Sequence, residues 1–421
     1  MVEGLSPVKG STPMRRALLI APLAIALAAS GALIAPATAA PPILPSEFGL
    51  HVPGIASGED PQSPYGTVRL WDSGVTWGQV EQAKGKYWWN GMDGAISNAN
   101  NQKVQILYVL GSTPTWAAKN KSQGRYPNRG AASMPSMKDW KSWVNAVTTR
   151  YGDSIESYQI WNEANLQDFW RGTPRQMALL TREAYKIIKR NDPTATVVSA
   201  SSTVRLQSAY KRFFPKYLKE LRKMGWPVDA ISVHTYPEST GTPQTRNQYL
   251  AQVKADMRKA RVPASKQLWD TEINYGLAGP GPRFPKQNID PTTGAAWVAQ
   301  TYLDNLIYGV DRAYWYFWFN NSPVLGIQMN NGLPAATAFQ TVQSWLAGSY
   351  YSCTQGDPNV CNLGDNVNVE TVVWSSKGSG TYTVPAGVST TCTALNQCTP
   401  VTPGSTVTIG SMPQWFGTPG R

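Results

Sequence analysis

The sequence predicts a (β/α)8 barrel followed by a small antiparallel β-domain. Eight short apolar runs, each ending in polar residues, recur between residues 48 and 318. Such runs are typical of parallel strands that are buried on both faces. Helical patterns lie between most of them, and eight strand-and-helix units over about 300 residues match this barrel in count and size. After Ala347 the composition changes to Ser, Thr, Gly and Val, and helical periodicity ends.

The eight expected strands follow one another along this stretch. They cover residues 48–52, 67–71, 104–110, 158–161, 196–200, 230–233, 267–269 and 312–318. The first two runs are close in sequence, and no convincing helix pattern lies between them.

Five helices are expected between or after the later strands. The clearest begins with Thr173 as N-cap and Pro174 at the first helical position, and Asp192-Pro193 ends it. Pro215 is expected to kink the second helix. The remaining four cover residues 208–224, 248–260, 293–308 and 335–346.

Residues 1–39 are predicted to be a secretory signal peptide. Arg15 and Arg16 precede an apolar run over residues 17–35, and Ala37-Thr38-Ala39 has the small-residue pattern of a cleavage site. A membrane anchor is the alternative, but helix-breaking residues in the run and the cleavage pattern favour removal. We therefore expect a secreted or cell-wall-associated protein with no membrane span after cleavage, and a barrel over residues 40–347.

The segment 348–421 is assigned to the β-domain, with exposed strands at 370–374 and 406–409. All four cysteines lie in it. Exported chains meet oxidising conditions, so disulfides are expected rather than buried thiols, and the absence of CxxC spacing disfavours a metal site. Of the three possible pairings we expect the one between nearest neighbours, namely Cys353–Cys361 and Cys392–Cys398.

The composition excludes several classes of function. The chain has 17 tryptophans but only two histidines, so a His-rich metal cage is excluded and a Ser/His/Asp triad has little support. No P-loop, no GxGxxG after a strand and no HExxH occurs. The net charge of +12 comes without a nucleic-acid recognition motif. Solvated helix faces explain this charge best, with attraction to an anionic cell wall second.

Two glutamates stand at the ends of expected strands on opposite sides of the barrel. Glu163 follows the fourth strand and Glu272 the seventh, where barrel proteins place reacting groups. Burying an unpaired carboxylate next to apolar residues is costly, so a purpose is expected for each. A pair of carboxyl groups serves glycoside hydrolysis, one as proton donor and one as nucleophile or base. A separation near ~5 Å predicts retention of configuration, and a wider one inversion.

The sequence resembles the clan A glycoside hydrolases, which are retaining enzymes on (β/α)8 barrels. The resemblance covers about residues 48–345 and rests on short motifs at the ends of five strands, namely Arg69, Asn162-Glu163, His234-x-Tyr236, Glu272 and Trp318. It implies that Glu163 is the acid/base, that Glu272 is the nucleophile, and that neither a cofactor nor a metal is needed.

The resemblance also implies roles for the neighbouring residues. Asn162 would hydrogen-bond the sugar 2-hydroxyl, and Arg69 and Tyr236 would hold Glu272 ionised. His234 would line the site together with Tyr236, because residues two apart on a strand point to the same face. Trp318, or Trp315 if the strand register differs, would form the floor of the sugar site.

Within the clan, two segments resemble the family 39-like group of β-xylosidases and α-L-iduronidases. They are Ser112–Trp116 after the third strand and Asn162–Asn165 followed by Phe169-Trp170. The small β-domain also fits this group. One departure concerns the strand at 104–110, which lacks the histidine that many clan members carry there.

Tryptophans in this chain are expected to serve both packing and sugar binding. Trp140, Trp143 and Trp345 stand in helical patterns and are expected in the core, whereas Trp116 and Trp170 are candidates for stacking on a carbohydrate substrate. The loop 275–294 is a candidate rim of the site, with an excursion away from it as the alternative. Two other functions stay open at this stage: a furanosidase of the same clan, and a non-catalytic carbohydrate-binding protein. The sugar, the linkage and the oligomeric state are not specified by the sequence.

Overall fold

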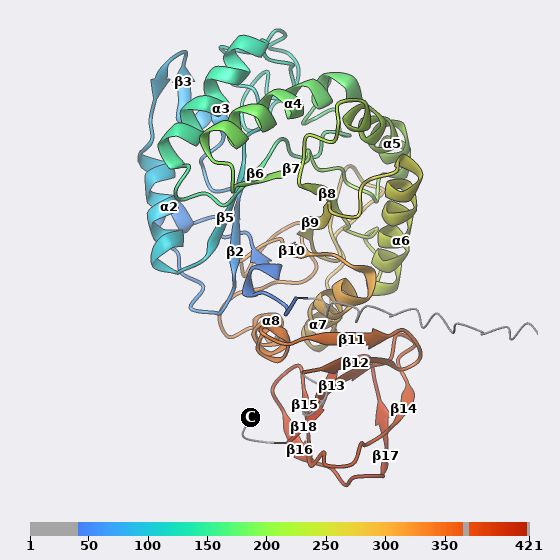
Figure 1. Cartoon of the computed structure of the whole chain (residues 1–421). Coiled ribbons are helices and arrows are strands. Elements are labelled where there is room, and N and C mark those ends of the chain that lie inside the picture. The colour runs from blue at the N-terminus through green and yellow to red at the C-terminus, as the bar shows by residue number, and fades with distance from the viewer. Residues whose placement is uncertain (1–40, 365–369, 419–421) are drawn as a thin grey trace, which may run out of the picture. The chain divides into compact units, whose positions relative to one another are not determined.

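Eight parallel strands close into a barrel, as the sequence predicts (Figure 1). The computed structural model describes residues 41–364 and 370–418. The strand order around the barrel is β1-β10-β9-β8-β7-β6-β5-β2, and each expected run overlaps one strand. The strands are β1 (Phe48–Leu50), β2 (Thr67–Leu70), β5 (Gln105–Val109), β6 (Ser157–Gln159), β7 (Thr196–Val198), β8 (Ala230–His234), β9 (Gln267–Ile273) and β10 (Arg312–Trp315).

Helices surround the barrel, and the five expected ones are all present. They are α4 (Pro174–Asn191), α5 (Gln207–Lys223), α6 (Pro243–Ala260), α7 (Pro291–Tyr308) and α8 (Pro334–Leu346). The expected cap of α4 is confirmed, since Thr173 Oγ1 accepts from the Gln176 N–H and the Gln176 side chain accepts from the Thr173 N–H. The helix α5 runs unbroken across Pro215.

Only a 3-10 turn, η2 (Ile55–Ser57), lies between β1 and β2, in agreement with the missing helix pattern there. The connection from β2 to β5 holds the short helix α1 (Trp77–Val80), a hairpin and α2 (Asn90–Asn101). The hairpin strands are β3 (Glu81–Ala83) and β4 (Lys86–Tyr87). Our sequence analysis missed α2 because it is rich in Asn and Gly, which are poor helix formers.

Aromatic side chains fill the space between the barrel and α3 (Met137–Tyr151). Trp140 and Trp143 are fully buried, as expected, and both pack against Trp77, with the rings of Trp77 and Trp143 stacked at 5.7 Å. Trp345 is partly buried and packs on the same core. These tryptophans therefore stabilise the fold.

The C-terminal segment forms antiparallel sheets, as expected. A six-stranded sheet has the order β11-β12-β13-β18-β15-β16, and β14 pairs with β17. The strand β13 is buried apart from its first residue, which corrects our expectation of an exposed strand, because it lies between β12 and β18. The strands are β11 (Tyr351–Thr354), β12 (Asn359–Leu363), β13 (Glu370–Trp374), β14 (Gly380–Thr383), β15 (Thr390–Thr393), β16 (Cys398–Pro400), β17 (Thr406–Ile409) and β18 (Gln414–Gly417).

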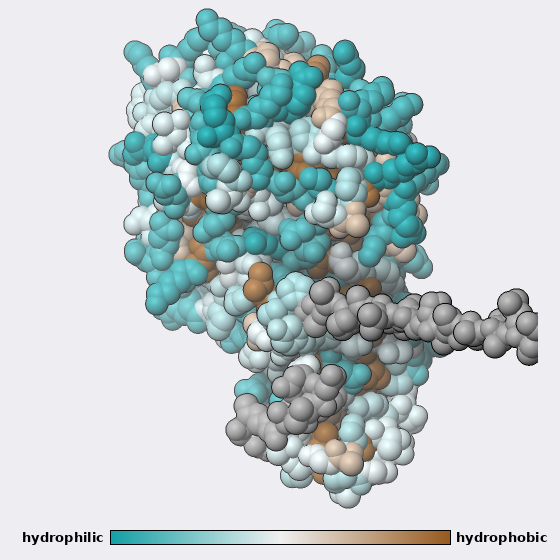
Figure 2. Space-filling model, viewed as in Figure 1, coloured by the Kyte–Doolittle hydropathy of each residue, from teal (hydrophilic) through white to brown (hydrophobic). Residues whose placement is uncertain are grey.

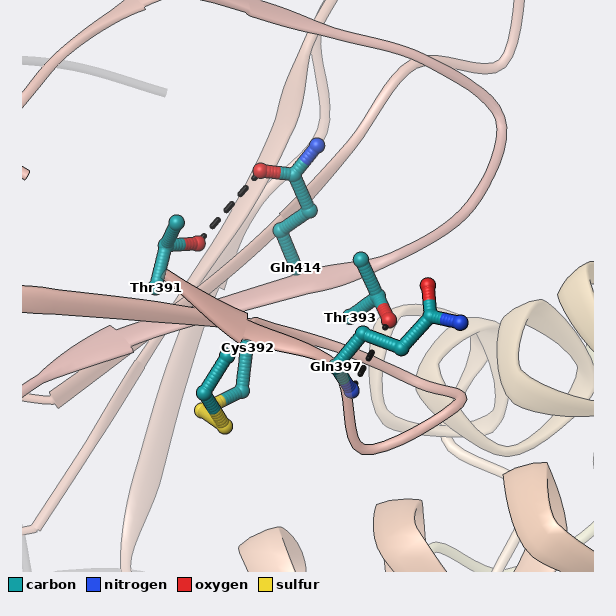
Figure 3. The surroundings of a disulfide bond; sticks show 6 residues. Thr391, Cys392, Thr393, Gln397 and Gln414 are labelled. Carbon is teal, nitrogen blue, oxygen red and sulfur yellow. Dashed lines mark hydrogen bonds between the residues drawn. A yellow bond between two sulfur atoms is a disulfide. The ribbon is translucent and has the colours of Figure 1, made fainter. Parts of the chain in front are cut away.

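Two disulfides join neighbouring strands of this sheet, and the nearest-neighbour pairing is confirmed. Cys353 pairs with Cys361 between β11 and β12, and Cys392 with Cys398 between β15 and β16. Around the second bridge, the Thr391 hydroxyl donates to Gln414 Oε1 at 3.4 Å (Figure 3). The residues that the structure describes, 41–364 and 370–418, cluster as one compact unit. The domain boundary at residue 347 stays a prediction.

The surface carries the basic charge on its outer helices. Hydrophilic side chains gather over α4, α5 and α6 (Figure 2). Lys211, Lys216 and Lys219 on α5 are exposed, as expected for a solvated helix face. The predicted signal peptide lies outside the described residues. In the part of the chain that the structure describes, no helix combines the length and apolar character needed to cross a membrane.

Candidate active site

Glu272, near the end of β9, is held by two donors from other strands. Arg69 Nη1 on β2 donates to Glu272 Oε1 at 2.7 Å, and the Tyr236 hydroxyl after β8 donates to Oε2 at 2.9 Å. Burial alone would raise the pKa of Glu272, but His234 and Arg69 outweigh it and hold that pKa well below its usual range. Glu272 is therefore an oriented, ionised carboxylate.

The Arg69 guanidinium connects this carboxylate to two further polar groups. Its Nη2 donates to Asn162 Oδ1 at 2.8 Å, and its Nε donates to Gln159 Oε1 at 2.8 Å. Arg69 is only 1% exposed, so the surrounding barrel residues hold its planar guanidinium group in one orientation. The sequence analysis did not single out Gln159. Its position in the sequence could have identified it. Gln159 stands on β6, two residues before Trp161, and the strand directs its side chain to an inner face.

Glu163 follows β6 in a strained backbone conformation. Its φ is +38°, a region that residues other than glycine rarely adopt. The Glu163 N–H donates to Ser201 Oγ at 2.8 Å, and the Ala164 N–H donates to the Ser201 carbonyl at 2.9 Å. The segment after β7 therefore holds this turn in place. Strain of this kind concentrates at functional sites.

His234, the last residue of β8, lies between the two carboxylates. Its Nδ1 is 3.1 Å from Glu163 Oε1 and 3.2 Å from Glu272 Oε2. One carboxylate oxygen of each glutamate lies within 4.8 Å of the other. Burial lowers the pKa of His234, but Glu272 and Glu163 outweigh it and raise that pKa to about 9. A protonated imidazole therefore neutralises part of the negative charge.

A cleft of about 590 Å³ opens above these residues. Asn162, Glu163, Tyr236 and Glu272 line it, whereas Arg69 and His234 are buried beneath its surface. Residues 277–280 of the expected rim loop also line the cleft. Its aromatic lining comes from Trp71, Tyr126, Phe169, Tyr236 and Tyr316.

Two lining residues that the sequence analysis missed organise the rim. Asp72 accepts hydrogen bonds from the hydroxyls of Tyr126 and Tyr316. Arg205 donates to the carbonyls of Leu277 and Gly279, so it fixes the rim loop. Asp72 stands three residues after Arg69, two residues after the end of β2, and the strand-end rule that identified Glu163 applies to it equally. Arg205 lies in a loop whose path no local pattern indicates.

The three tryptophans expected to bind sugar do not line the cleft. Trp116 donates from Nε1 to the Glu81 carbonyl at 2.7 Å and lies edge-on to Trp77. Trp170 is buried against Trp161, and Trp318 is 1% exposed. The fallback residue Trp315 is fully buried. Tyr316 occupies the cleft wall at the end of β10 instead.

Glu163, His234 and Glu272 also form the one cluster in the described residues whose spacing would suit a metal ion. The donor set opposes that use. Both oxygens of Glu272 already accept hydrogen bonds, and the Arg69 cation is 2.7 Å from one of them. A metal cation would have to compete with these positive and donating groups.

The fold and the site define a (β/α)8 barrel protein with two facing carboxyl groups in an aromatic-lined cleft. A family model described as the glycosyl hydrolase catalytic core matches residues 77–338. The chain belongs to this family.

Two curated proteins share sequence with the chain. It is 29% identical over 185 residues to a β-xylosidase of Caldicellulosiruptor saccharolyticus, across 40% of this chain and 36% of that protein. It is 26% identical over 287 residues to endoglucanase A of Paenibacillus lautus, across 57% of this chain and 39% of that protein. The matches therefore span less than two-fifths of either relative.

Solved structures share the fold. A family 39 glycoside hydrolase from Bacteroides cellulosilyticus WH2 superposes with a TM-score of 0.68 at 18% identity, covering 90% of this chain and 82% of that one. A monomeric β-xylosidase from Caulobacter crescentus CB15 gives 0.63 at 14% identity, covering 90% and 97%. These neighbours agree with the family 39-like resemblance of the sequence.

Proposed function

We propose that the protein is a retaining glycoside hydrolase that cleaves a poly- or oligosaccharide, with Glu163 as acid/base and Glu272 as nucleophile. The observation that carries the proposal is that one oxygen of Glu163 and one oxygen of Glu272 lie within 4.8 Å of one another, with His234 Nδ1 in contact with both side chains. Retaining enzymes hold this pair about 5–5.5 Å apart, and inverting enzymes need a wider gap for a water molecule. Membership of the glycosyl hydrolase family supports the same chemistry.

The reaction has two steps. Glu163 donates its proton to the glycosidic oxygen while a Glu272 oxygen attacks the anomeric carbon, so that an alcohol leaves and a glycosyl ester forms. Glu163 then takes a proton from water, the water oxygen bonds to the anomeric carbon, and Glu272 is released. The ionised state of Glu272, held against burial by His234 and Arg69, is the state that attack requires, and the Tyr236 hydroxyl orients the carboxylate.

The neighbours of the pair assist in binding and proton control. Asn162 lines the cleft, and the Arg69 contact fixes its amide, which supports a role for Asn162 in binding the hydroxyl next to the attacked carbon. The His234 N–H lies between the two carboxylates, and the positive charge of the protonated ring reduces the repulsion between them. Tyr316 lines the cleft and is the aromatic residue after β10 that we propose for contact with the sugar, in place of the floor residue Trp318 that the resemblance implies.

The test is a pair of variants with an activated aryl glycoside panel. Glu163→Ala should lose far less activity on substrates with good leaving groups, which need no proton, than on substrates with poor ones. Added azide should restore turnover and give a glycosyl azide with the anomeric configuration of the substrate. Glu272→Ala should lose at least about 10³-fold in kcat on every substrate, and proton NMR of the wild-type reaction should show retained configuration. Glu220→Ala on the outer face of α5 is the matched control. Near-normal activity of Glu272→Ala would overturn the nucleophile assignment.

We also propose that the protein works outside the cell or on the cell wall. The two disulfides support this, because such bonds persist in oxidising compartments. The intact mass of the protein recovered from culture medium should correspond to a chain that begins at Ala40. A cytoplasmic protein that retains residues 1–39 would contradict it.

A further inference from the structure

A third carboxylate in the cleft has no part in the proposed reaction. Asp72 lies two residues after the end of β2 and lines the cleft with Glu163 and Glu272. Its two oxygens accept one tyrosine hydroxyl each, from Tyr126 at 2.6 Å and from Tyr316 at 2.8 Å. These tyrosines belong to the connections after β5 and β10, so three separate segments converge to hold one side chain.

Asp72 stands close to the reacting centre. The Tyr316 ring lies edge-on to the Tyr236 ring, with centroids 6.2 Å apart at 90°, and the Tyr236 hydroxyl donates to Glu272. One tyrosine ring therefore separates Asp72 from the residue that orients the nucleophile. Burial and the charge of Glu272 both raise the pKa of Asp72, which agrees with this proximity.

The Asp72 carboxylate and the two tyrosine hydroxyls bound to it form a surface of hydrogen-bond acceptors. Each carboxylate oxygen has a further lone pair after accepting one hydroxyl, and each tyrosine, having donated its proton, presents only lone pairs. A ligand that matches this surface must bring O–H donors. Two adjacent sugar hydroxyls fit the two oxygens, and hydrogen bonds to a charged acceptor are the stronger kind.

The charges around the cleft disfavour a sugar that carries its own carboxylate. Asp72, Glu163 and Glu272 all face the cleft. Among the described lining residues the only cationic side chain is Arg205, and its guanidinium donates to the carbonyls of Leu277 and Gly279. A uronic acid would add a negative charge to a cleft that three carboxyl groups face, where the single lining cation already donates to backbone carbonyls.

We propose that Asp72, positioned by Tyr126 and Tyr316, binds hydroxyl groups of the substrate and makes the cleft selective for uncharged sugars over uronic acids. This inference rests on the proposed glycosidase function and adds the substrate class to it.

The test uses aryl glycosides in pairs that differ only at carbon 6. The pairs are the 4-nitrophenyl β-D-glucoside with the β-D-glucuronide and the β-D-galactoside with the β-D-galacturonide. The wild type should hydrolyse a neutral member at least about 100-fold faster, as kcat/KM, than its uronide. Asp72→Asn keeps the shape, removes the charge and adds an N–H donor, so that ratio should fall about 10-fold or more. Asp153→Asn, outside the cleft, should leave the ratio unchanged.

Tyr126→Phe keeps the test independent of how well Asp72→Asn folds. It removes one anchor at a half-exposed ring, and KM for the neutral substrate should rise about 3- to 10-fold with a smaller change in kcat. A wild type that cleaves uronides as fast as neutral glycosides would overturn the inference alone. So would an unchanged ratio in Asp72→Asn together with an unchanged KM in Tyr126→Phe. Failure to cleave any glycoside would overturn the proposed function and this inference with it.

Discussion

Arg69 Nη1 lies 2.7 Å from Glu272 Oε1, and this contact joins the second and the seventh strands of the barrel deep in its interior. The same guanidinium donates to Asn162, so one side chain orients both the proposed nucleophile and the Asn162 amide. Both partners are buried, so water screens the pair little. Removal of either charge would leave the other buried and uncompensated.

Replacement of Arg69 should therefore change both the rate and its pH dependence. We expect Arg69→Met to lower kcat at least about 100-fold, since the positive charge that helps keep Glu272 ionised is gone. The pKa of Glu272 should rise, so the acidic limb of the kcat/KM profile should move to higher pH. Arg69→Lys keeps the positive charge, so its acidic limb should lie between those of the wild type and Arg69→Met. Lysine lacks the planar guanidinium and cannot replace its set of hydrogen bonds. The exposed Arg150→Lys is the control, and an unmoved acidic limb in Arg69→Met would contradict the prediction.

Loss of the Tyr236 hydroxyl should have a smaller effect of the same kind. Tyr236→Phe removes one hydrogen bond to Glu272 Oε2, and a bond to a charged group contributes about 1.5–3 kcal/mol, or roughly 10- to 150-fold in kcat. Tyr158→Phe is the matched control, because the Tyr158 hydroxyl is buried without a partner among the described residues. Steady-state kinetics of both variants test this. Equal kcat values in Tyr236→Phe and Tyr158→Phe would show that the hydrogen bond from Tyr236 to Glu272 does not contribute to the rate.

Most of the fold could be predicted because its signals are local. Each barrel strand is a short apolar run, and helices such as α4 carry their own caps in the sequence. The strand-end rule needs only these runs, and it identified Glu163 and Glu272. Arg69 and Tyr236 followed from the resemblance to clan A, and both contact Glu272 in the structure. The helix α2 lacked such a signal, since its packing on the barrel rather than its propensity stabilises it.

The aromatic and rim residues of the cleft could not be predicted in this way. Whether a tryptophan forms a platform or packs in the core depends on where the loops run, and Trp170 turns inward onto Trp161. The Tyr126 hydroxyl donates to Asp72 although the two residues are 54 positions apart in the chain. Such pairs follow from tertiary contacts between loops, which leave no periodic pattern in the sequence.

The pH dependence of stability should report on His234. Its folded pKa of about 9 lies above the ordinary value near 6.5, so the folded state holds this proton more tightly. The resulting stabilisation, about 3 kcal/mol at most, is complete below pH 6.5 and is lost as the pH rises to 9. Urea unfolding at pH 6.5, 7.5 and 9 should show this fall, and His234→Asn should flatten it. Asp304 and Glu47, whose pKa values burial raises to about 7, lose their protons near pH 7, so the fall between pH 7.5 and 9 is the part that reports on His234. An equal fall in the variant would show that other groups cause it.

The two disulfides should differ in their contribution to stability although they close similar loops. Their sequence separations of 8 and 6 residues predict nearly equal loop-closure effects, roughly 2–3 kcal/mol each. Cys361 is fully buried in the main core, whereas Cys398 is exposed. The double variant Cys353→Ala/Cys361→Ala should therefore lose about 1 kcal/mol more in the free energy of unfolding than Cys392→Ala/Cys398→Ala, because it also leaves a cavity. Guanidinium unfolding of both variants measures the difference. None of the four cysteines lines the cleft, so kcat/KM should stay the same in both, and a larger loss in the Cys392/Cys398 variant would contradict the burial argument.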